Sequence, residues 1–108
     1  MWNGKKKAVT FSYDDGVTQD RRLVEMMNTY GVKGTFNLNS GMQSYANVWE
    51  HPKGLLIHRM NTEGLKELYQ GHEIAAHCLT HADLPKYDGD TIRYEIVVDN
   101  KDVVDQFG

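Results

Sequence analysis

The sequence predicts an α/β domain made of parallel β/α units, and two observations support this prediction. Short runs of β-branched, aromatic and small apolar residues alternate with stretches in which apolar residues recur at helical spacing. The first strand, the first helix and the second strand together take up about thirty residues, the length of a βαβ unit, which implies parallel pairing and a right-handed crossover. A chain of 108 residues is expected to form one domain with a modest core.

The first predicted strand covers residues 8–13 (Ala-Val-Thr-Phe-Ser-Tyr) and is followed at once by Asp14, Asp15 and Gly16. Two adjacent carboxylates repel each other, so their placement at one strand end costs free energy unless a cation or a reaction uses them. Gly16 allows the tight turn that points them away from the sheet. An Asp-Gly pair is also ordinary turn chemistry, so this motif alone leaves a plain turn open.

The first predicted helix begins after Thr18 as its N-cap and ends at Gly31. The apolar side chains that recur on one side of it are Leu23, Met26, Met27 and Tyr30. Residues 32–38 form the second predicted strand, which ends at Asn39. In parallel α/β folds, functional groups gather at the carboxyl ends of the strands, and both the Asp-Asp pair and Asn39 lie at such ends.

Residues 40–60 predict an ordered loop with a short extended piece at residues 54–58. Aromatic and aliphatic residues within this stretch are not typical of disorder. His51 and His58 are isolated histidines without a spaced partner, so they are expected to be solvated or structural rather than metal ligands.

A third β/α unit and a long helix make up the rest of the chain. Asn61 or Thr62 is expected to cap a helix that precedes the third strand at residues 72–77. The buried stripe of that helix is expected to contain Leu65, Leu68 and Tyr69. The last helix begins at Asp88 or Asp90. Its apolar residues in helical phase are Ile92, Ile96, Val103 and Phe107, with Val97 and Val104 beside them.

Composition and charge exclude several classes of function. The formal net charge is −3, so electrostatics gives no case for a nucleic-acid partner, and the basic run at residues 5–7 is interpreted as solvated. No apolar segment is long enough to span a membrane, and the N-terminus lacks the hydrophobic stretch of a signal peptide. The single cysteine, Cys78, cannot form an internal disulfide. We therefore expect a soluble module, cytoplasmic by default.

Two histidines four residues apart, His77 and His81, follow directly after the third predicted strand. Such a pair can face one way in a tight loop, but a zinc site needs a third ligand. The Asp-Asp-Gly turn offers that ligand at the carboxyl end of another strand of the same sheet. Two imidazoles and one carboxylate leave coordination positions open, which is typical of a catalytic ion. In a plainer interpretation, these acids and histidines are only turn residues.

The motifs occur in the order Asp14-Asp15-Gly16, residues 33–36 (Lys-Gly-Thr-Phe), residues 71–74 (Gly-His-Glu-Ile) and His77-x-x-x-His81. From about residue 7 to residue 108, the chain thereby resembles the polysaccharide deacetylases of carbohydrate esterase family 4, the NodB-homology domain. The resemblance implies a partial distorted (β/α) barrel and a metal-dependent esterase that removes acetyl groups from N-acetylated sugars. It also implies that Asp14 is the general base, while the divalent metal ion is bound by Asp15, His77 and His81. Zinc suits this mixed oxygen and nitrogen ligand set, and other transition ions are admissible.

The chain departs from the family pattern in two ways. The residue after the first histidine is usually serine or threonine in this family, and here it is Cys78, a weaker hydrogen bonder that leaves the loop less firmly braced. The family's later motifs, which include a histidine serving as general acid, would follow residue 108. Residues 1–108 thus correspond to the N-terminal half of the domain, and this chain is expected to show little activity. The alternative function is a non-catalytic metal- or glycan-binding module.

An incomplete barrel also predicts self-association. The strands at residues 8–13 and 72–77 are expected to lie near open sheet edges. The inner sheet face is expected to expose apolar surface at Phe11, Phe36 and Ile74 or their neighbours. Open edges and an apolar face favour pairing with a second copy. The expected partners are therefore an acetylated glycan as substrate and a second copy in a homodimer or larger even oligomer.

Overall fold

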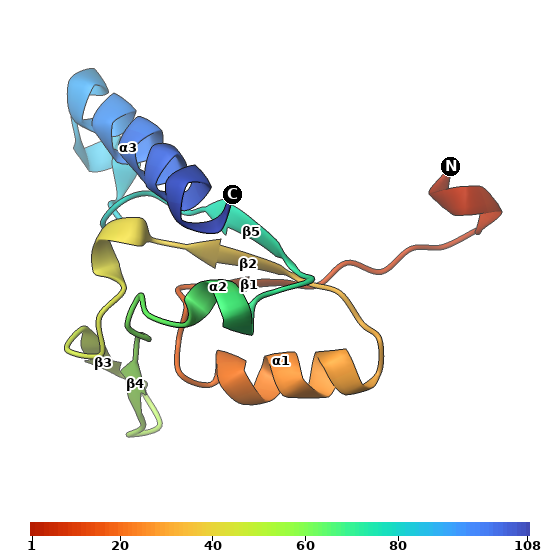
Figure 1. Ribbon diagram of the computed structural model, residues 1–108. Helices are drawn as coiled ribbons and strands as arrows, with labels where there is room; N and C mark the ends of the chain where they lie inside the picture. Colours follow the sequence, from red (N-terminus) through yellow and green to blue (C-terminus); the bar gives the residue numbers. More distant parts are fainter.

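The centre of the computed structural model, which describes residues 1–108, is a three-stranded parallel sheet (Figure 1). In chain order, the elements are η1 (Trp2–Gly4), β1 (Ser12–Asp14), α1 (Asp20–Thr29), β2 (Thr35–Leu38), η2 (Ser40–Met42), β3 (Val48–Glu50), β4 (Leu56–His58), α2 (Leu65–Leu68), β5 (Glu73–Ala76), η3 (Leu84–Lys86) and α3 (Gly89–Phe107). The sheet has the strand order β1-β2-β5, and both strand pairs are parallel. The predicted parallel β/α units are confirmed, and the sheet stays open rather than closing into a barrel.

The hydrophobic core lies between the sheet and helices α1 and α2. Its buried side chains are Val24, Met27, Phe36, Leu38, Met60, Leu65 and Tyr69. Phe36 is fully buried, and its ring packs against Tyr13 and Tyr69 with centroid distances of 5.8 and 4.6 Å. This core fixes β2 against two helices and thereby sets the direction of the loop that follows it.

The strands are shorter than predicted. β1 begins at Ser12 rather than at residue 8, because β2 begins only at Thr35 and the earlier residues have no strand to pair with. Phe11 still accepts a 2.9 Å hydrogen bond from the Thr35 N–H through its carbonyl oxygen. Before this point, the chain runs away from the sheet as an extended segment that ends in η1 (Figure 1).

Helix α1 turns only part of its predicted apolar stripe to the core: Met27 is buried and Leu23 packs against the core. Its buried residues are Asp20, Val24 and Met27. Met26 and Tyr30, both expected in the buried stripe, are exposed. The cause is Asp20, which begins the helix facing inward and accepts a 2.7 Å hydrogen bond from the Tyr69 hydroxyl. A polar contact in the core therefore sets the rotation of this helix.

Two predicted helix starts are wrong. Gln19, not Thr18, precedes α1, and Gly64 precedes α2 in place of Asn61 or Thr62. Gly64 has a φ of +80°, a left-handed conformation that glycine adopts without strain. The chain turns at this glycine, which delays the start of α2 and reduces the helix to little more than one turn.

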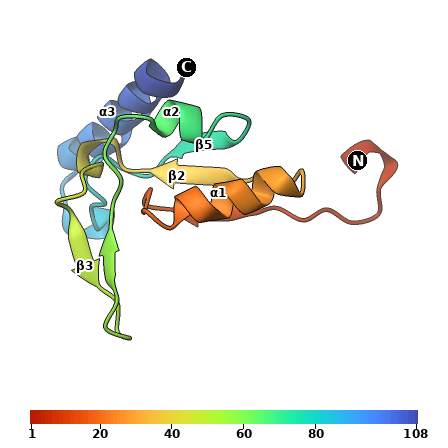
Figure 2. The ribbon, with the colours of Figure 1, turned by 60° about the horizontal axis from the view of Figure 1, so that its bottom comes forward.

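The stretch predicted as an ordered loop contains a β-hairpin. Strands β3 and β4 pair antiparallel, with Trp49 opposite Ile57. Strand β4 matches the predicted extended piece, whereas the sequence pattern does not indicate β3, although Val48 and Trp49 are residues that favour strands. Figure 2 shows that the hairpin projects away from the three-stranded sheet.

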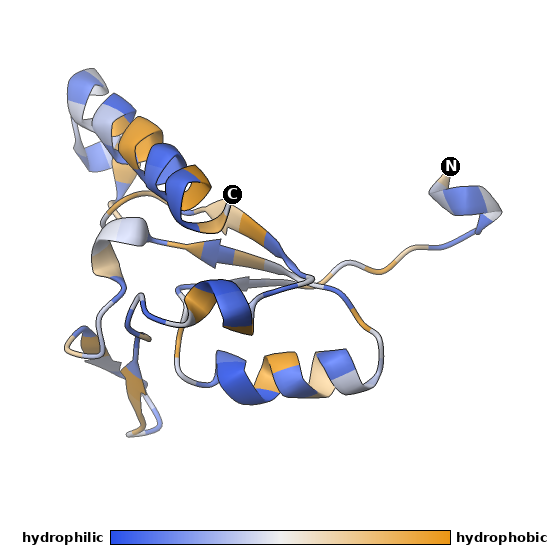
Figure 3. Cartoon of the chain, in the orientation of Figure 1, coloured by the Kyte–Doolittle hydropathy of each residue, from blue (hydrophilic) through white to orange (hydrophobic).

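Helix α3 begins at one of its two predicted positions, because the Asp88 carboxylate accepts a 2.7 Å hydrogen bond from the Thr91 N–H as an N-cap. Its buried side matches the predicted one only near the C-terminus, where Val103 is buried and Phe107 packs against the core. The buried residues of α3 are Glu95, Asp99 and Val103. Its exposed apolar residues include Ile96, Val97 and Val104. Figure 3 shows these hydrophobic and hydrophilic segments alternating along α3. No helix in the structure has both the length and the apolar character needed to cross a membrane.

The face of the sheet opposite the core is polar, which corrects one expectation. Asn37 donates a 2.8 Å hydrogen bond to the Ser12 hydroxyl, and the Thr35 hydroxyl donates one of 2.7 Å to the Glu73 carboxylate. Phe36, expected to expose apolar surface on this face, points instead into the core because alternate residues of a strand face opposite ways. The prediction that β1 and β5 are the outer strands is confirmed.

Candidate metal centre

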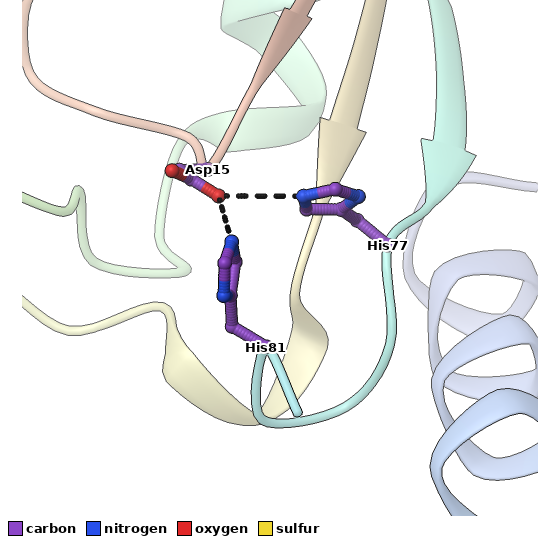
Figure 4. A group of neighbouring side chains, drawn as sticks. All are labelled: Asp15, His77 and His81. Carbon is purple, nitrogen blue, oxygen red and sulfur yellow. Dashed lines mark ion pairs between the residues drawn. The ribbon is translucent and has the colours of Figure 1, made fainter. Parts of the chain in front are cut away.

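Three side chains from two loops meet at the carboxyl edge of the sheet (Figure 4). Asp15 follows β1, while His77 and His81 follow β5. The Asp15 Oδ1 atom lies 3.6 Å from His77 Nε2 and 3.4 Å from His81 Nε2. The ligand atoms of the three residues all lie within 4.8 Å of one another. The structure thus brings together the three residues that are predicted to bind a metal ion.

The donor set fits a tetrahedral transition-metal ion. Zinc binds imidazole nitrogen and carboxylate oxygen at about 2.0–2.2 Å, which places tetrahedral ligand atoms about 3.4 Å apart. The two distances from Asp15 Oδ1 agree with this spacing. The same oxygen is buried and accepts no hydrogen bond. An unpartnered buried acceptor costs free energy, and a cation held between Asp15 and the histidines would remove that cost.

The Asp-Asp-Gly turn aims Asp15 at the histidines. Asp15 and Gly16 have φ angles of +79° and +61°, both in the left-handed region. Aspartate tolerates this conformation better than most residues, whereas a Cβ at Gly16 would lie 2.6 Å from the Gln43 side chain. The Asp15 N–H still donates a 2.9 Å hydrogen bond to the Asn37 carbonyl, so the turn is tied to β2. Glycine is therefore favoured here chiefly by its positive φ, because the Gln43 side chain can move away from a Cβ.

Arg59 is a site residue that the sequence motifs do not reveal. Its buried guanidinium donates 2.8 Å hydrogen bonds to the Asp15 carbonyl and to Asn39 Oδ1, and it lies 3.6 Å from Asp15 Oδ1. It also stacks over the Trp49 ring, 5.5 Å from the centroid. Burial lowers the pKa of Arg59 from its usual value, and the Asp15 charge opposes that shift. Arg59 and its partner Asp15 are 44 residues apart in the sequence, and at this separation no local sequence pattern indicates that the two residues interact.

Asn39 links Arg59 to the loop between β5 and η3 that carries His77 and His81, which we call the histidine loop. It is fully buried at the end of β2, where the sequence predicts a functional position. Its amide group donates hydrogen bonds to the carbonyl oxygens of His77 and Cys78, the latter at 2.8 Å. Asn39 therefore ties the loop after β2 to the loop after β5, and through Arg59 to the Asp15 turn.

Asp15, His77 and His81 form the candidate metal-ligand group. Asp14 lies beside this group and is not part of it. Its Oδ1 atom accepts a 2.9 Å hydrogen bond from the Asn37 amide. Its Oδ2 atom lies 3.9 Å from His77 Nε2, and the side chain is more than half exposed. Adjacent carboxylates thus have different surroundings, because Asp15 turns inward while Asp14 stays on the open face of the sheet.

His51 and His58 lie outside the centre, as their lack of spaced partners predicts. His51 is exposed at the tip of the hairpin, where its Nδ1 atom accepts a 3.1 Å hydrogen bond from the Lys53 N–H. His58 stacks in parallel on Tyr45, with ring centroids 4.0 Å apart. Neither residue contacts Asp15, His77 or His81 in the site.

An open pocket of about 520 Å³ adjoins the metal-ligand group. Its lining residues are Asp15, Met42, Asn47, Val48, Trp49, Arg59, Thr80 and His81. The pocket therefore connects two of the predicted metal ligands with the aromatic face of the β3–β4 hairpin. A ligand bound at the metal centre would have Trp49 within the same hollow.

The fold and the site together define an open parallel α/β domain with a three-ligand candidate metal site at the carboxyl edge of its sheet. Comparison with protein families gives the assignment: the polysaccharide deacetylase family matches residues 2–108, and the chain belongs to this family of deacetylase-type enzymes. A chitin deacetylase from Pestalotiopsis sp is 31% identical over 78 residues, which make up 71% of this chain and 22% of that protein.

A solved structure shows the same fold. The Streptococcus pyogenes deacetylase PplD, determined in complex with acetate, matches with a TM-score of 0.78 at 20% sequence identity. The match covers 96% of this chain and 43% of that chain. The present chain thus spans less than half the length of either relative, and the open sheet agrees with part of a larger β/α barrel.

Proposed function

We propose that this chain carries the metal site and the general base of a metal-dependent deacetylase that acts on N-acetylated sugars. The observation that carries the proposal is the convergence of Asp15, His77 and His81, with Asp14 beside them, in a member of the polysaccharide deacetylase family. The similarity to a chitin deacetylase supports an acetylated glycan as substrate. The acetate bound to the Streptococcus pyogenes relative is the product expected of this reaction.

Asp15, His77 and His81 would hold the ion, and zinc is the ion that we propose. Two nitrogen donors and one oxygen donor suit zinc and admit other transition ions. The chemistry that such an ion supplies is acidification of water and polarisation of the acetyl carbonyl. The residues of the chain have separate tasks: Arg59 fixes the Asp15 turn, and Asn39 fixes the histidine loop.

Asp14 is proposed to take the proton from the attacking water. Its Oδ2 atom faces His77 and is open to solvent, while the Asn37 amide holds Oδ1 and thus orients the carboxylate. A carboxylate next to a cation stays ionised and can accept a proton. The other histidines do not belong to the group of Asp15, His77 and His81, and we assign none of them as the general acid for the leaving amine.

Because no general acid is assigned, the test uses a substrate that does not need one. An aryl acetate such as 4-nitrophenyl acetate has a leaving group that departs without protonation, so its hydrolysis needs only metal ion and base. Because the chain is expected to show little activity, we expect only slow zinc-dependent hydrolysis of this activated ester and still slower acetate release from chitotetraose. Asp14→Asn should lower the ester rate by about 10²–10⁴-fold, the usual contribution of general base catalysis, while zinc affinity changes little.

Three variants provide the controls. His77→Ala and His81→Ala should lose both zinc binding, measured by titration against a chromogenic chelator, and ester hydrolysis. His51→Ala changes an exposed histidine outside the site and should leave both unchanged. The proposal is contradicted if the histidine variants bind zinc as tightly as the parent. If the parent binds zinc and chitotetraose but hydrolyses neither substrate, the alternative of a non-catalytic metal- or glycan-binding module is correct.

We also propose that the chain forms a homodimer or a larger even oligomer through its open strands. β1 and β5 each have one strand neighbour, and exposed sheet edges favour pairing with another chain. The face of the sheet opposite the core is polar and therefore does not favour association with a second copy. The proposal of an oligomer rests only on the open edges of β1 and β5. Size-exclusion chromatography with light scattering tests it, and a monomer that persists at high protein concentration contradicts it.

A further inference from the structure

We propose that Asp99 and Glu95 on helix α3 are positioning residues for the metal centre, an inference that rests on the proposed metal binding. Both carboxylates are buried although neither touches Asp15. Their hydrogen bonds go to the loop that carries His77 and His81 and to the loop after β2. They would hold the two histidines at the mutual distance that a metal ion requires.

The histidine loop is a segment that needs such support. Between β5 and η3 it forms no regular secondary structure. Cys78 and His81 have φ angles of +69° and +56°, and residues other than glycine are strained in this left-handed region. Strained backbone persists only where surrounding contacts fix it, so the contacts around this loop decide whether the two imidazoles stay together.

Asp99 joins the two loops with one carboxylate. Its side chain is 0% exposed. Its Oδ1 atom accepts a 2.7 Å hydrogen bond from the Ser40 N–H, and its Oδ2 atom accepts one of 2.8 Å from the His77 N–H. The His77 N–H is shared with the Leu38 carbonyl at 3.0 Å. Both oxygens therefore face backbone donors, and the backbone of His77 is fixed at the point where β5 ends.

Glu95 holds the other end of the loop through Thr80, the residue before His81. Its two carboxylate oxygens accept 2.8 and 2.7 Å hydrogen bonds from the Thr80 N–H and hydroxyl. Its backbone carbonyl accepts a 3.1 Å hydrogen bond from the Leu79 N–H. The hydroxyl of Thr80 thus provides bracing that the thiol of Cys78 is poorly suited to give.

The two carboxylates predict different responses to amide substitution. Asp99 faces two N–H donors, so Asp99→Asn would turn its own NH₂ group toward one of them and lose that hydrogen bond. Glu95 faces one N–H and one hydroxyl, so Glu95→Gln can accept from the N–H through its carbonyl and donate to the hydroxyl. Loss of charge is the same in both variants, and only the hydrogen-bond geometry differs. Glu95→Ala removes both bonds to the Thr80 side of the loop.

The experiment measures zinc affinity by competition with a chromogenic chelator, together with the visible spectrum of the Co²⁺ form. Asp99→Asn and Glu95→Ala should bind zinc about 10–100-fold more weakly than the parent, the usual cost of removing a residue that orients a metal ligand. Both should alter the Co²⁺ spectrum. Glu95→Gln should remain within a few-fold of the parent. Asp105→Asn, an exposed position on the same helix, is the matched control and should change neither measurement.

The outcomes separate this inference from the proposed function. If His77→Ala binds zinc as tightly as the parent, the proposed metal site itself is wrong. If the parent requires His77 but folded Asp99→Asn and Glu95→Ala retain parental zinc affinity, only the positioning role is wrong, even if both unfold at lower temperature. If Asp99→Asn does not fold, the comparison of Glu95→Ala with Glu95→Gln decides, because equal zinc affinities in those two variants contradict the inference.

Discussion

Asp20 makes the stability of this domain depend on pH in a direction opposite to that of most carboxylates. Its side chain is 4% exposed at the start of α1. Burial raises its pKa from 3.8 to about 6, the Tyr69 hydroxyl opposes that rise by hydrogen bonding, and the charge of Asp15 adds to it. Between pH 4 and 6 the folded protein therefore keeps a proton that the unfolded chain has released.

The sign and size of the effect follow from this difference. Because the folded state binds more protons in this window, the free energy of unfolding falls as the pH rises. A shift from 3.8 to about 6 corresponds to about 3 kcal/mol at 1.36 kcal/mol per pKa unit. This stabilisation is fully present below pH 4 and is lost as the pH rises through 6. Asp20→Asn cannot ionise, so the variant should not suffer this loss.

The assay is urea unfolding followed by circular dichroism, in buffers that contain a chelator so that the charge of Asp15 remains uncompensated. The free energy of unfolding of Asp20→Asn minus that of the parent should increase by about 3 kcal/mol between pH 3.5 and 7. Other carboxylates titrate in both proteins and cancel in the difference. Asp105→Asn, at an exposed position, should give a flat difference. A flat difference for Asp20→Asn as well would refute the reasoning.

Three further predictions concern the core, the histidine loop and the pocket. Leu38→Ala, at a position that is 1% exposed, should lower the free energy of unfolding by about 2–5 kcal/mol in urea titrations. Cys78→Ser should leave zinc affinity within a few-fold, because the loop is held through Glu95 rather than through the thiol; a loss of tenfold or more would contradict this. Trp49→Ala should weaken chitotetraose binding by about tenfold in calorimetry, as expected for truncation of an aromatic contact, whereas Trp2→Ala should have no effect.

The sequence predicts the fold class and the grouping of the site residues because both depend on local patterns. Strand runs that end in Asp15 or His77 place these side chains at one edge of a parallel sheet, whatever the details of the rest. Local patterns do not predict the role of Arg59, because its partners Asn39 and Asp15 lie 20 and 44 residues away in the sequence. It also misses β3, because a short exposed strand has no buried face to impose alternation on its sequence.

Hydrophobic periodicity predicts the buried side of α3 at Val103 but not along the rest of the helix, because the helix also buries Glu95 and Asp99, which periodicity assigns to solvent. Val97 is 57% exposed, while Asp99 is fully buried. A buried carboxylate is costly unless strong hydrogen bonds satisfy it, and Asp99 and Glu95 each satisfy this condition with donors from the loops beside the site. Pattern-based prediction treats acids as surface residues and has no information about donors that arrive from another part of the chain. The error on α3 therefore arises where the helix contacts the loops of the candidate metal site, as expected where local patterns give way to the demands of a site.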